Sequence, residues 1–170
     1  METTTDNELR RSSEQFRVDC LQAALGKLPA VECPLLHRFT PGLYTREIFM
    51  PAGTMVVSRI HKTEHPYAVL AGRALVWTAD AGVVEIKAGH IGITTPGTRR
   101  VLLIAEDCRW VTFHPTSETD LAKLQDELTV TPDVTYAAGD LDALKILEQL
   151  QAAARLTLPA GRHGIEEKTS

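Results

Sequence analysis

The sequence predicts an all-β protein, a barrel of short strands with one helix before it and two helices after it. Between residues 43 and 114, apolar runs recur about every ten residues and are bounded by Gly, Pro, Asp or charged pairs, which is typical of an all-β sandwich or barrel. No segment between these runs is long enough for a crossover helix, so a parallel α/β architecture is disfavoured. After Pro115 the apolar spacing becomes helical.

Each apolar run of this region is expected to form one strand. The run from Thr54 to Ile60 and the run from Tyr67 to Ala71 are joined by a short polar segment, which predicts a β-hairpin. Residues 29–42 contain three prolines and are expected to form an extended connection. The expected strands are residues 43–50, 54–60, 66–72, 73–79, 83–88, 91–95, 99–105 and 109–114.

Helices are expected outside the barrel. Residues 6–25 combine a capping Asp or Asn with apolar residues at helical spacing. A second helix begins with Ser117 as its N-cap, and after a loop at residues 129–138 a third helix covers residues 140–156. The chain is therefore divided into an N-terminal helix and extended arm (1–42), a barrel (43–115), C-terminal helices (116–158) and a flexible tail (159–170).

Composition narrows the class of protein. A chain of 170 residues with 44% hydrophobic residues is expected to form one domain with a buried core. The net charge of −4 argues against nucleic-acid binding. Three widely spaced cysteines argue against a disulfide framework or a zinc ribbon and favour a cytoplasmic protein. No apolar run reaches the ~20 residues that span a bilayer, and the first residues lack the apolar core of a signal peptide.

Residues 51–72 contain the one dense cluster of potential metal ligands. Gly53 opens and Gly72 closes this segment, and between them it resembles the first motif of the cupin superfamily. That motif runs from a Gly through His-x-His and a Glu to a second Gly. His61 stands at the second His position, His65 at the Glu position and Arg59 at the first His position.

Residues 89–100 resemble the second cupin motif, with Arg100 at the position of its His. The resemblance implies a cupin-like jelly-roll barrel, and the runs HKTEHP, PGTRR and FHPT are similar to those of cupins from bacteriophage genomes. Cupins include enzymes, sugar epimerases, sensors and storage proteins. An enzyme of this kind would be a metal-dependent dioxygenase or isomerase. The resemblance also implies a homodimer, and a phage protein would be located in the host cytoplasm or the virion.

Alternation along the strands places Arg59, His61, His65 and Tyr67 on the inner wall of such a barrel. Two imidazoles alone hold a metal weakly, and His114 at the end of the last strand can supply a third. A site formed by His61, His65 and His114 would bind one divalent transition metal, zinc, iron, manganese or nickel. The alternative is that these histidines are polar residues of a metal-free barrel.

The arginines suggest a second kind of site. An inward Arg100, with Arg59 and Tyr67 nearby, would hold a carboxylate, a phosphate or a sugar nucleotide by bidentate hydrogen bonds. Arg99 and Arg100 are adjacent in an expected strand, so one guanidinium points inward and the other outward. The alternative is a solvated outer arginine and an ion pair to Glu85 or Glu106. Trp77 and Trp110 are expected in the barrel core, and the remaining histidines, His37, His90 and His163, on the surface.

These observations lead to one functional expectation and one alternative. The barrel mouth is expected to bind a divalent metal, a small anionic ligand or both, with a small molecule rather than nucleic acid or a membrane as partner. The alternative is a metal-free structural or interaction protein, such as a virion component, that uses the barrel as a scaffold. The last helix carries an apolar stripe that packs either on its own barrel or on a second subunit, and of these two expectations we favour the second subunit.

Overall fold

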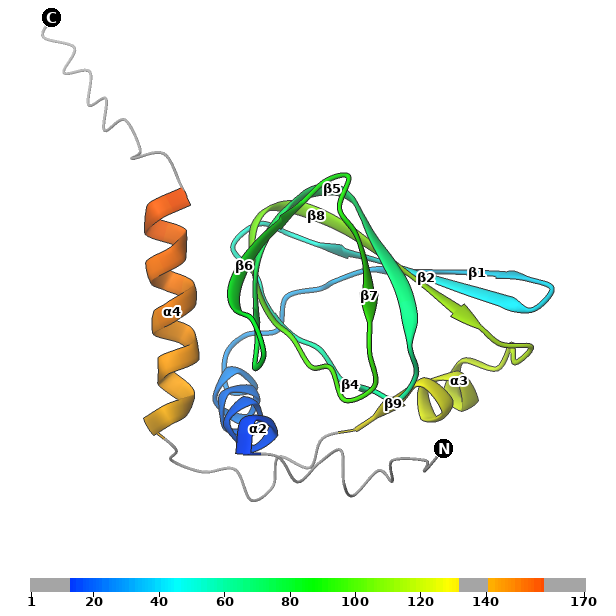
Figure 1. Cartoon of the computed structure of the whole chain (residues 1–170), viewed down its shortest axis with the longest axis horizontal. Coiled ribbons are helices and arrows are strands. Elements are labelled where there is room, and N and C mark those ends of the chain that lie inside the picture. The colour runs from blue at the N-terminus through cyan, green and yellow to red at the C-terminus, as the bar shows by residue number, and fades with distance from the viewer. Residues whose placement is uncertain (1–12, 132–140, 158–170) are drawn as a thin grey trace, which may run out of the picture.

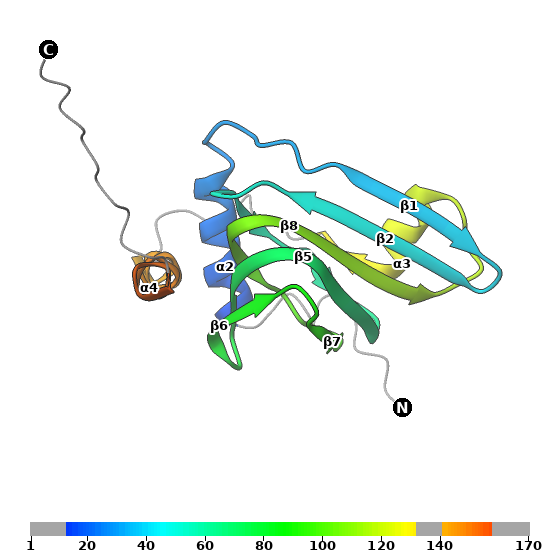
Figure 2. The ribbon, with the colours of Figure 1, turned by 90° about the horizontal axis from the view of Figure 1, so that it is seen from above.

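A computed structural model describes residues 13–131 and 141–157 of the chain. An antiparallel β-barrel forms the centre of the molecule (Figure 1). The helices described outside the barrel are α2 (Ser13–Leu25), α3 (Leu121–Leu128) and α4 (Leu141–Thr157). α2 and α4 lie together at one end, and α3 lies at the other (Figures 1 and 2). The predicted fold class, an all-β barrel with one N-terminal and two C-terminal helices, is confirmed.

The main sheet has the strand order β1-β2-β8-β5-β6, with β3 paired to β8 and β7 paired to β5. β4 and β9 form a separate two-stranded sheet. All of these pairs are antiparallel. The strands are β1 (Leu35–Thr40), β2 (Leu43–Met50), β3 (Met55–Val57), β4 (Ile60–His61), β5 (His65–Thr78), β6 (Gly82–Lys87), β7 (Ile91–Thr94), β8 (Val101–Pro115) and β9 (Thr129–Val130).

β5 and β8, of 14 and 15 residues, each replace two of the expected strands. Gly72 and the charged pair Glu106–Asp107, which separated the expected strands, lie at register shifts inside the continuous ladder of β5 and β8. In this ladder Arg73 pairs with Glu106. Gly72 has φ 79°, and a Cβ atom on it would lie 2.0 Å from the backbone oxygen of Asp107. A glycine is therefore required because the two long strands approach closely at an irregularity.

The predicted hairpin between residues 54–60 and 67–71 is wrong. Residues 54–60 divide into β3, which pairs with β8, and β4, which pairs with β9. Ser58, between them, donates its backbone N–H to the carbonyl of Arg100. Two other segments, expected as connections, form strands: part of 29–42 forms β1 and part of 129–138 forms β9. β1 forms a hairpin with the adjacent β2, in which Thr40 pairs with Leu43, so the prolines of this segment hid a local pairing. β9 pairs with β4, a partner distant in the sequence that local patterns do not reveal.

α3 and α4 begin close to the expected positions. Asp120, not Ser117, is the N-cap of α3, because its Oδ1 accepts hydrogen bonds from the backbone N–H groups of Ala122 (2.9 Å) and Lys123 (3.0 Å). The expected start of the first helix at residues 6–12 and the expected cap Asp140 lie outside the described residues. No helix in the described ranges is long and apolar enough to cross a membrane.

Buried side chains form two large clusters. The barrel interior contains Met50, Val69, Ile104 and Trp110. The second cluster lies between the barrel and the helices at one end. It joins Val18, Leu21, Leu75, Trp77, Ile146 and Leu150. The expected burial of both tryptophans is confirmed. The buried stripe of α4 covers its own chain, which was the less favoured of the two expectations for this helix.

Candidate functional site

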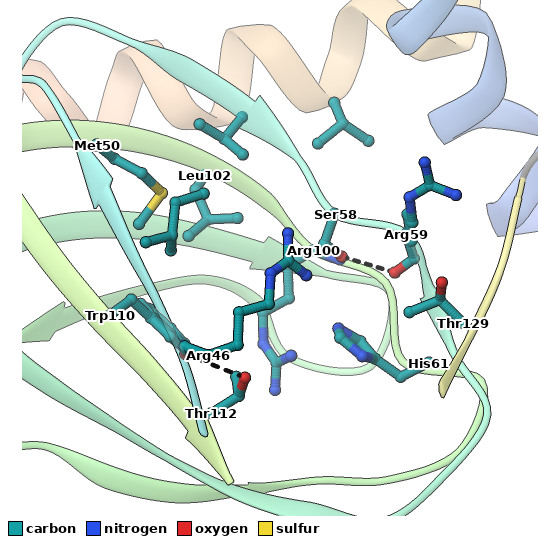
Figure 3. A pocket seen from close by; sticks show the side chains of 13 residues that line it. Arg46, Met50, Ser58, Arg59, His61, Arg100, Leu102, Trp110, Thr112 and Thr129 are labelled. Carbon is teal, nitrogen blue, oxygen red and sulfur yellow. Dashed lines mark hydrogen bonds between the residues drawn. The ribbon is translucent and has the colours of Figure 1, made fainter. Parts of the chain in front are cut away.

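A cavity of about 290 Å³ opens at the barrel mouth, and we call it the mouth cavity. Polar and apolar side chains lie at different ends of it: Figure 3 shows Met50, Leu102 and Trp110 on one side and Arg59, His61 and Thr129 on the other, with Arg46 and Arg100 between them. Ile48, Val56, Val57, Ser58 and Thr112 complete the wall. Among the described residues, none of those lining this cavity is acidic.

Arg100 lies immediately before β8 and is 8% exposed. Its backbone N–H donates to Ser58 Oγ (2.9 Å), and its Nη2 donates to Thr94 Oγ1 (3.0 Å). The guanidinium carbon is 4.9 Å from the ring centroid of Tyr67 and 6.0 Å from that of Trp110. Burial lowers the pKa of Arg100, but an arginine side chain keeps its charge in proteins. The guanidinium thus rests on aromatic rings and a hydroxyl.

Arg46 in β2 brings a second guanidinium to the mouth cavity. Burial, together with the charge of Arg59, lowers the pKa of Arg46. Its neighbour Glu47 points to the opposite face of the strand, because successive side chains alternate, and there binds Arg38 (2.9 Å) and Arg109. No ion pair joins Arg46 to a carboxylate in the part of the chain that the structure describes. Arg46 and Arg100 are therefore two buried or half-buried cations of the mouth cavity without a neutralising acid among the described residues, and Arg59 adds a third guanidinium at its edge.

The other two predicted arginines have structural partners. Arg59 lines the edge of the mouth cavity, and its Nη1 donates to Thr131 Oγ1 (2.6 Å), next to β9. Arg99, expected on the outside, is buried and forms an ion pair with Asp19 of α2. Arg73, rather than either of the paired arginines, binds Glu85 and Glu106. Arg99 and Arg100 thus point to opposite sides of the barrel wall, and both are buried.

His61, His65 and His114 lie together at the polar end of the mouth. Ring centroids are 4.9 Å apart for His61 and His65, and 4.2 Å apart for His65 and His114. His65 Nδ1 donates to the Thr63 carbonyl (2.9 Å), and His114 Nε2 contacts Thr112 Oγ1 (2.9 Å). The buried nitrogens His61 Nδ1, His65 Nε2 and His114 Nδ1 have no hydrogen-bond partner among the described residues.

The same three imidazoles are neutral at neutral pH. Burial, followed by the neighbouring His65, lowers the pKa of both His61 and His114 to about 3. Burial also lowers the pKa of His65. A neutral imidazole is the form that binds metals. The described residues nevertheless contain no group of three or more His, Cys, Asp or Glu side chains in an arrangement that holds a metal ion. The donors have suitable chemistry, but the rings pack against one another.

Tyr67, expected to contact the ligand, supports Arg100 instead of lining the mouth cavity. Its ring stacks on Trp110 with centroids 4.7 Å apart, and its hydroxyl group contacts His90 Nε2 (3.1 Å). His90 is exposed as expected but has this partner, and His37 similarly contacts the Tyr44 hydroxyl (2.7 Å). His163 lies outside the described residues.

Sequence reasoning missed Arg46 and Thr94. Arg46 lies outside both motif-like segments, and Thr94 lies within residues 89–100 but not at a ligand position of the motif. The alternation of side chains along β2 contained the signal for Arg46. Arg46, Ile48 and Met50 share one face of that strand and all line the mouth cavity. Thr94, at the end of β7, reaches Arg100 only through the pairing of β7 with β5, which the sequence did not predict.

Comparisons with known proteins find similarity only to solved structures. No protein-family profile and no curated protein match this chain. A cupin-2 domain protein from Shewanella frigidimarina is 11% identical, with a TM-score of 0.40 over 56% of this chain and 92% of that chain. An RmlC-like cupin from Methanocaldococcus jannaschii is 12% identical, with a TM-score of 0.43 over 52% and 84%. An uncharacterised double-stranded β-helix protein from Klebsiella pneumoniae is 18% identical, with a TM-score of 0.45 over 62% and 90%.

Proposed function

We propose that the barrel mouth binds a small anion through Arg46 and Arg100. The observation that supports this is a cavity lined by three arginines, Arg46, Arg59 and Arg100, and, among the described residues, by no carboxylate. Arg59 lies at the edge and donates to Thr131, which leaves Arg46 and Arg100 as the anchors. Removing a charge from water costs several kcal/mol unless an opposite charge compensates it. A bound anion would supply that charge and would accept paired hydrogen bonds from the planar guanidinium groups.

The remaining polar groups of the mouth favour the same two arginines as anchors. Ser58 Oγ donates to the Arg59 carbonyl, Thr112 Oγ1 to the Arg46 carbonyl and Thr129 Oγ1 to the Gln125 carbonyl. These hydroxyl hydrogens already have acceptors within the protein. A guanidinium has five N–H groups, and that of Arg100 donates to Thr94 Oγ1 and lies against Tyr67. The two guanidinium groups therefore provide most of the donors for a ligand.

The direct experiment is titration calorimetry of the purified protein with sodium acetate and with inorganic phosphate at low ionic strength. Arg100→Ala should weaken binding by about 1.5–3 kcal/mol, the value of a hydrogen bond to a charged group. Arg38→Ala is the matched control, because Arg38 is half-exposed and lies on the edge strand β1. Absence of anion binding by the unmodified protein, or equal affinity in Arg100→Ala, would overturn the proposal.

A second candidate function is binding of a divalent transition metal by His61, His65 and His114. It is favoured by three neutral imidazoles, each with a buried ring nitrogen that lacks a partner among the described residues. The rings would have to rotate for these nitrogens to converge. Three imidazoles would leave coordination positions open, as in catalytic sites. A zinc, iron, manganese or nickel ion there would act as a Lewis acid toward a bound anion.

Elemental analysis of the purified protein tests the metal. The expected content is near one ion per chain, and it should fall sharply in His61→Ala and His65→Ala. His37→Ala is the control, since His37 lies on β1, outside the cluster. Metal-free protein whose melting temperature is unchanged by zinc, nickel, manganese or iron would contradict this candidate. Such a result would leave anion binding in place and would favour the metal-free form of the mouth.

The scaffold alternative has less support. A barrel that serves only as a scaffold can have its mouth filled by bulky side chains, whereas the mouth cavity has about 290 Å³ of space. An enzymatic role, of the dioxygenase or isomerase type, would require both the anion and the metal at this mouth. Measuring the two ligands separately therefore comes before any assay of activity.

A further inference from the structure

The boundary between the polar and the apolar end of the mouth cavity is marked by two pairs of strands, and both place it at the same position. In the pairing of β2 with β8, Arg46 lies opposite Thr112, and two residues along, Ile48 lies opposite Trp110. All four side chains line the cavity. Residues two apart on a strand face the same side, so this wall changes from polar to apolar within a single step.

The pairing of β3 with β8 repeats the change. Val56 lies opposite Leu102, and two residues along, Ser58 lies opposite Arg100, to which it is hydrogen-bonded through the backbone. Both pairs line the cavity as well. The two walls therefore agree on the position of the boundary. Figure 3 shows the result, with Met50, Leu102 and Trp110 at one end and the two guanidinium groups in the middle.

The size of the cavity limits what can lie across this boundary. A dry cavity of about 150 Å³ is enough for a benzene molecule, and pockets for drug-sized ligands begin at about 300 Å³. The mouth cavity, at about 290 Å³, suits one small molecule. A sugar nucleotide is larger than this cavity and would extend out of the mouth. An inorganic anion would occupy only the polar end of the cavity. The side chains of the apolar end would then contact no ligand, whereas they would contact the apolar tail of a larger ligand.

We infer that the ligand is amphipathic, with a compact anionic head held by Arg46 and Arg100 and a short apolar tail against Met50, Leu102 and Trp110. This inference rests on the proposed anion binding and narrows it from any small anion to one chemical class. The head is a carboxylate or a phosphate monoester, which share the charge and the acceptors that guanidinium groups recognise. The tail gains affinity from burial of apolar surface.

The experiment measures affinity across a homologous series by calorimetry, with acetate, butyrate and hexanoate as probes. Affinity should rise by up to about fourfold for each added methylene group until the apolar end is full. Hexanamide, which has the same chain without the charge, should bind much more weakly than hexanoate. Butyl phosphate compared with pentanoate then distinguishes the two head groups, and inorganic phosphate serves as the anion without a tail.

Val56→Phe fills the apolar end and should reduce the affinity for hexanoate far more than the affinity for acetate, so that the two affinities converge. Ile48→Phe, from the other strand pair, tests the same end independently, and folding of each variant is checked by circular dichroism. Val84→Phe on the exposed face of β6 is the matched control. Equal affinities for acetate and hexanoate in the unmodified protein would overturn this inference and leave anion binding intact. Failure of every anion to bind would overturn both.

Discussion

The Arg100 guanidinium lies over the ring of Tyr67, with 4.9 Å between the guanidinium carbon and the ring centroid. Tyr67 is fixed in turn by its stack on Trp110 and by the contact of its hydroxyl with His90. A ring face attracts a cation without neutralising it, whereas a carboxylate would form an ion pair. The aromatic support therefore holds Arg100 in place and keeps its charge available to a ligand.

Gly92 on β7 controls the position of this ring. A Cβ atom there would lie 2.6 Å from the ring and hydroxyl atoms of Tyr67. Gly92→Ala should displace Tyr67 and with it Arg100, which should weaken acetate binding by roughly tenfold, the value of about one hydrogen bond.

Gly89→Ala is the control: it strains the backbone at φ 90°, but its Cβ atom meets nothing within 4 Å. Both variants should lose stability in urea, and Gly92→Ala alone should lose anion affinity. Equal affinities would show that Tyr67 does not position Arg100.

Stability should fall as the pH is lowered from 6.5 toward 5. His61 and His114 have a pKa of about 3 in the folded protein, against about 6.5 in an unfolded chain. Below pH 6.5 the unfolded chain therefore binds protons that the folded protein does not, and acid favours unfolding. For each of these two histidines, the free energy of unfolding should fall by up to about 1.4 kcal/mol for every pH unit below 6.5.

Urea unfolding at several pH values between 7.5 and 5 measures this slope. The double variant His61→Gln/His114→Gln should show a shallower decline than the unmodified protein. His90→Gln, which changes an exposed histidine outside the cluster, should keep the original slope. A decline of the same steepness in the double variant would mean that other groups cause the pH dependence.

The buried ion pair between Arg99 and Asp19 should dominate the attachment of α2. Their side chains are 2% and 4% exposed, so Arg99→Met would leave the Asp19 carboxylate in the interior without this opposite charge. Loss of one partner of a buried pair typically costs about 3–5 kcal/mol. Arg109→Ala removes a half-exposed ion pair with Glu47 and should cost about 1 kcal/mol or less. Urea denaturation of the two variants provides the comparison, and similar losses would contradict the expectation.

Local sequence patterns predicted which residues form strands better than they predicted which strands pair with each other. Residues 43–50 form β2 as predicted, because the length of an apolar run and its bounding turn residues are local properties. The same residue types misled at Gly72 and at Glu106–Asp107, where they mark irregularities in long strands rather than turns. The pairings of β3 with β8 and of β4 with β9 join segments far apart in the chain. No short-range signal encodes those contacts.

The spacing of the cupin-like motifs predicted which of several residues lie together at the barrel mouth. His61, His65 and Arg100 stand in the cupin-like frame, and all lie at the barrel mouth. Arg59 stands in the same frame, but its guanidinium binds Thr131, in a segment that looked like a loop. Metal binding, the phage origin and the virion role stay predictions, because nothing in the fold tests them.

The full chain is predicted to form a homodimer, and light scattering at micromolar concentration should give twice the chain mass of 18.7 kDa. β1 is an edge strand with exposed apolar side chains, Leu35, Leu36 and Phe39, and such edges favour association. A chain ending at Val130 tests the role of α4. Ile146 and Leu150 pack with Leu75 and Trp77 of β5, so truncation should expose core residues.

We therefore expect truncation to lower the melting temperature markedly, whether or not the shortened chain still associates. Leu156→Ala is the control for α4, because Leu156 is 87% exposed and its loss should leave the melting temperature unchanged. A monomeric mass for the full chain would refute the dimer. Loss of the dimer on truncation with an unchanged melting temperature would place the subunit interface on α4 and contradict its role as a cover for the barrel.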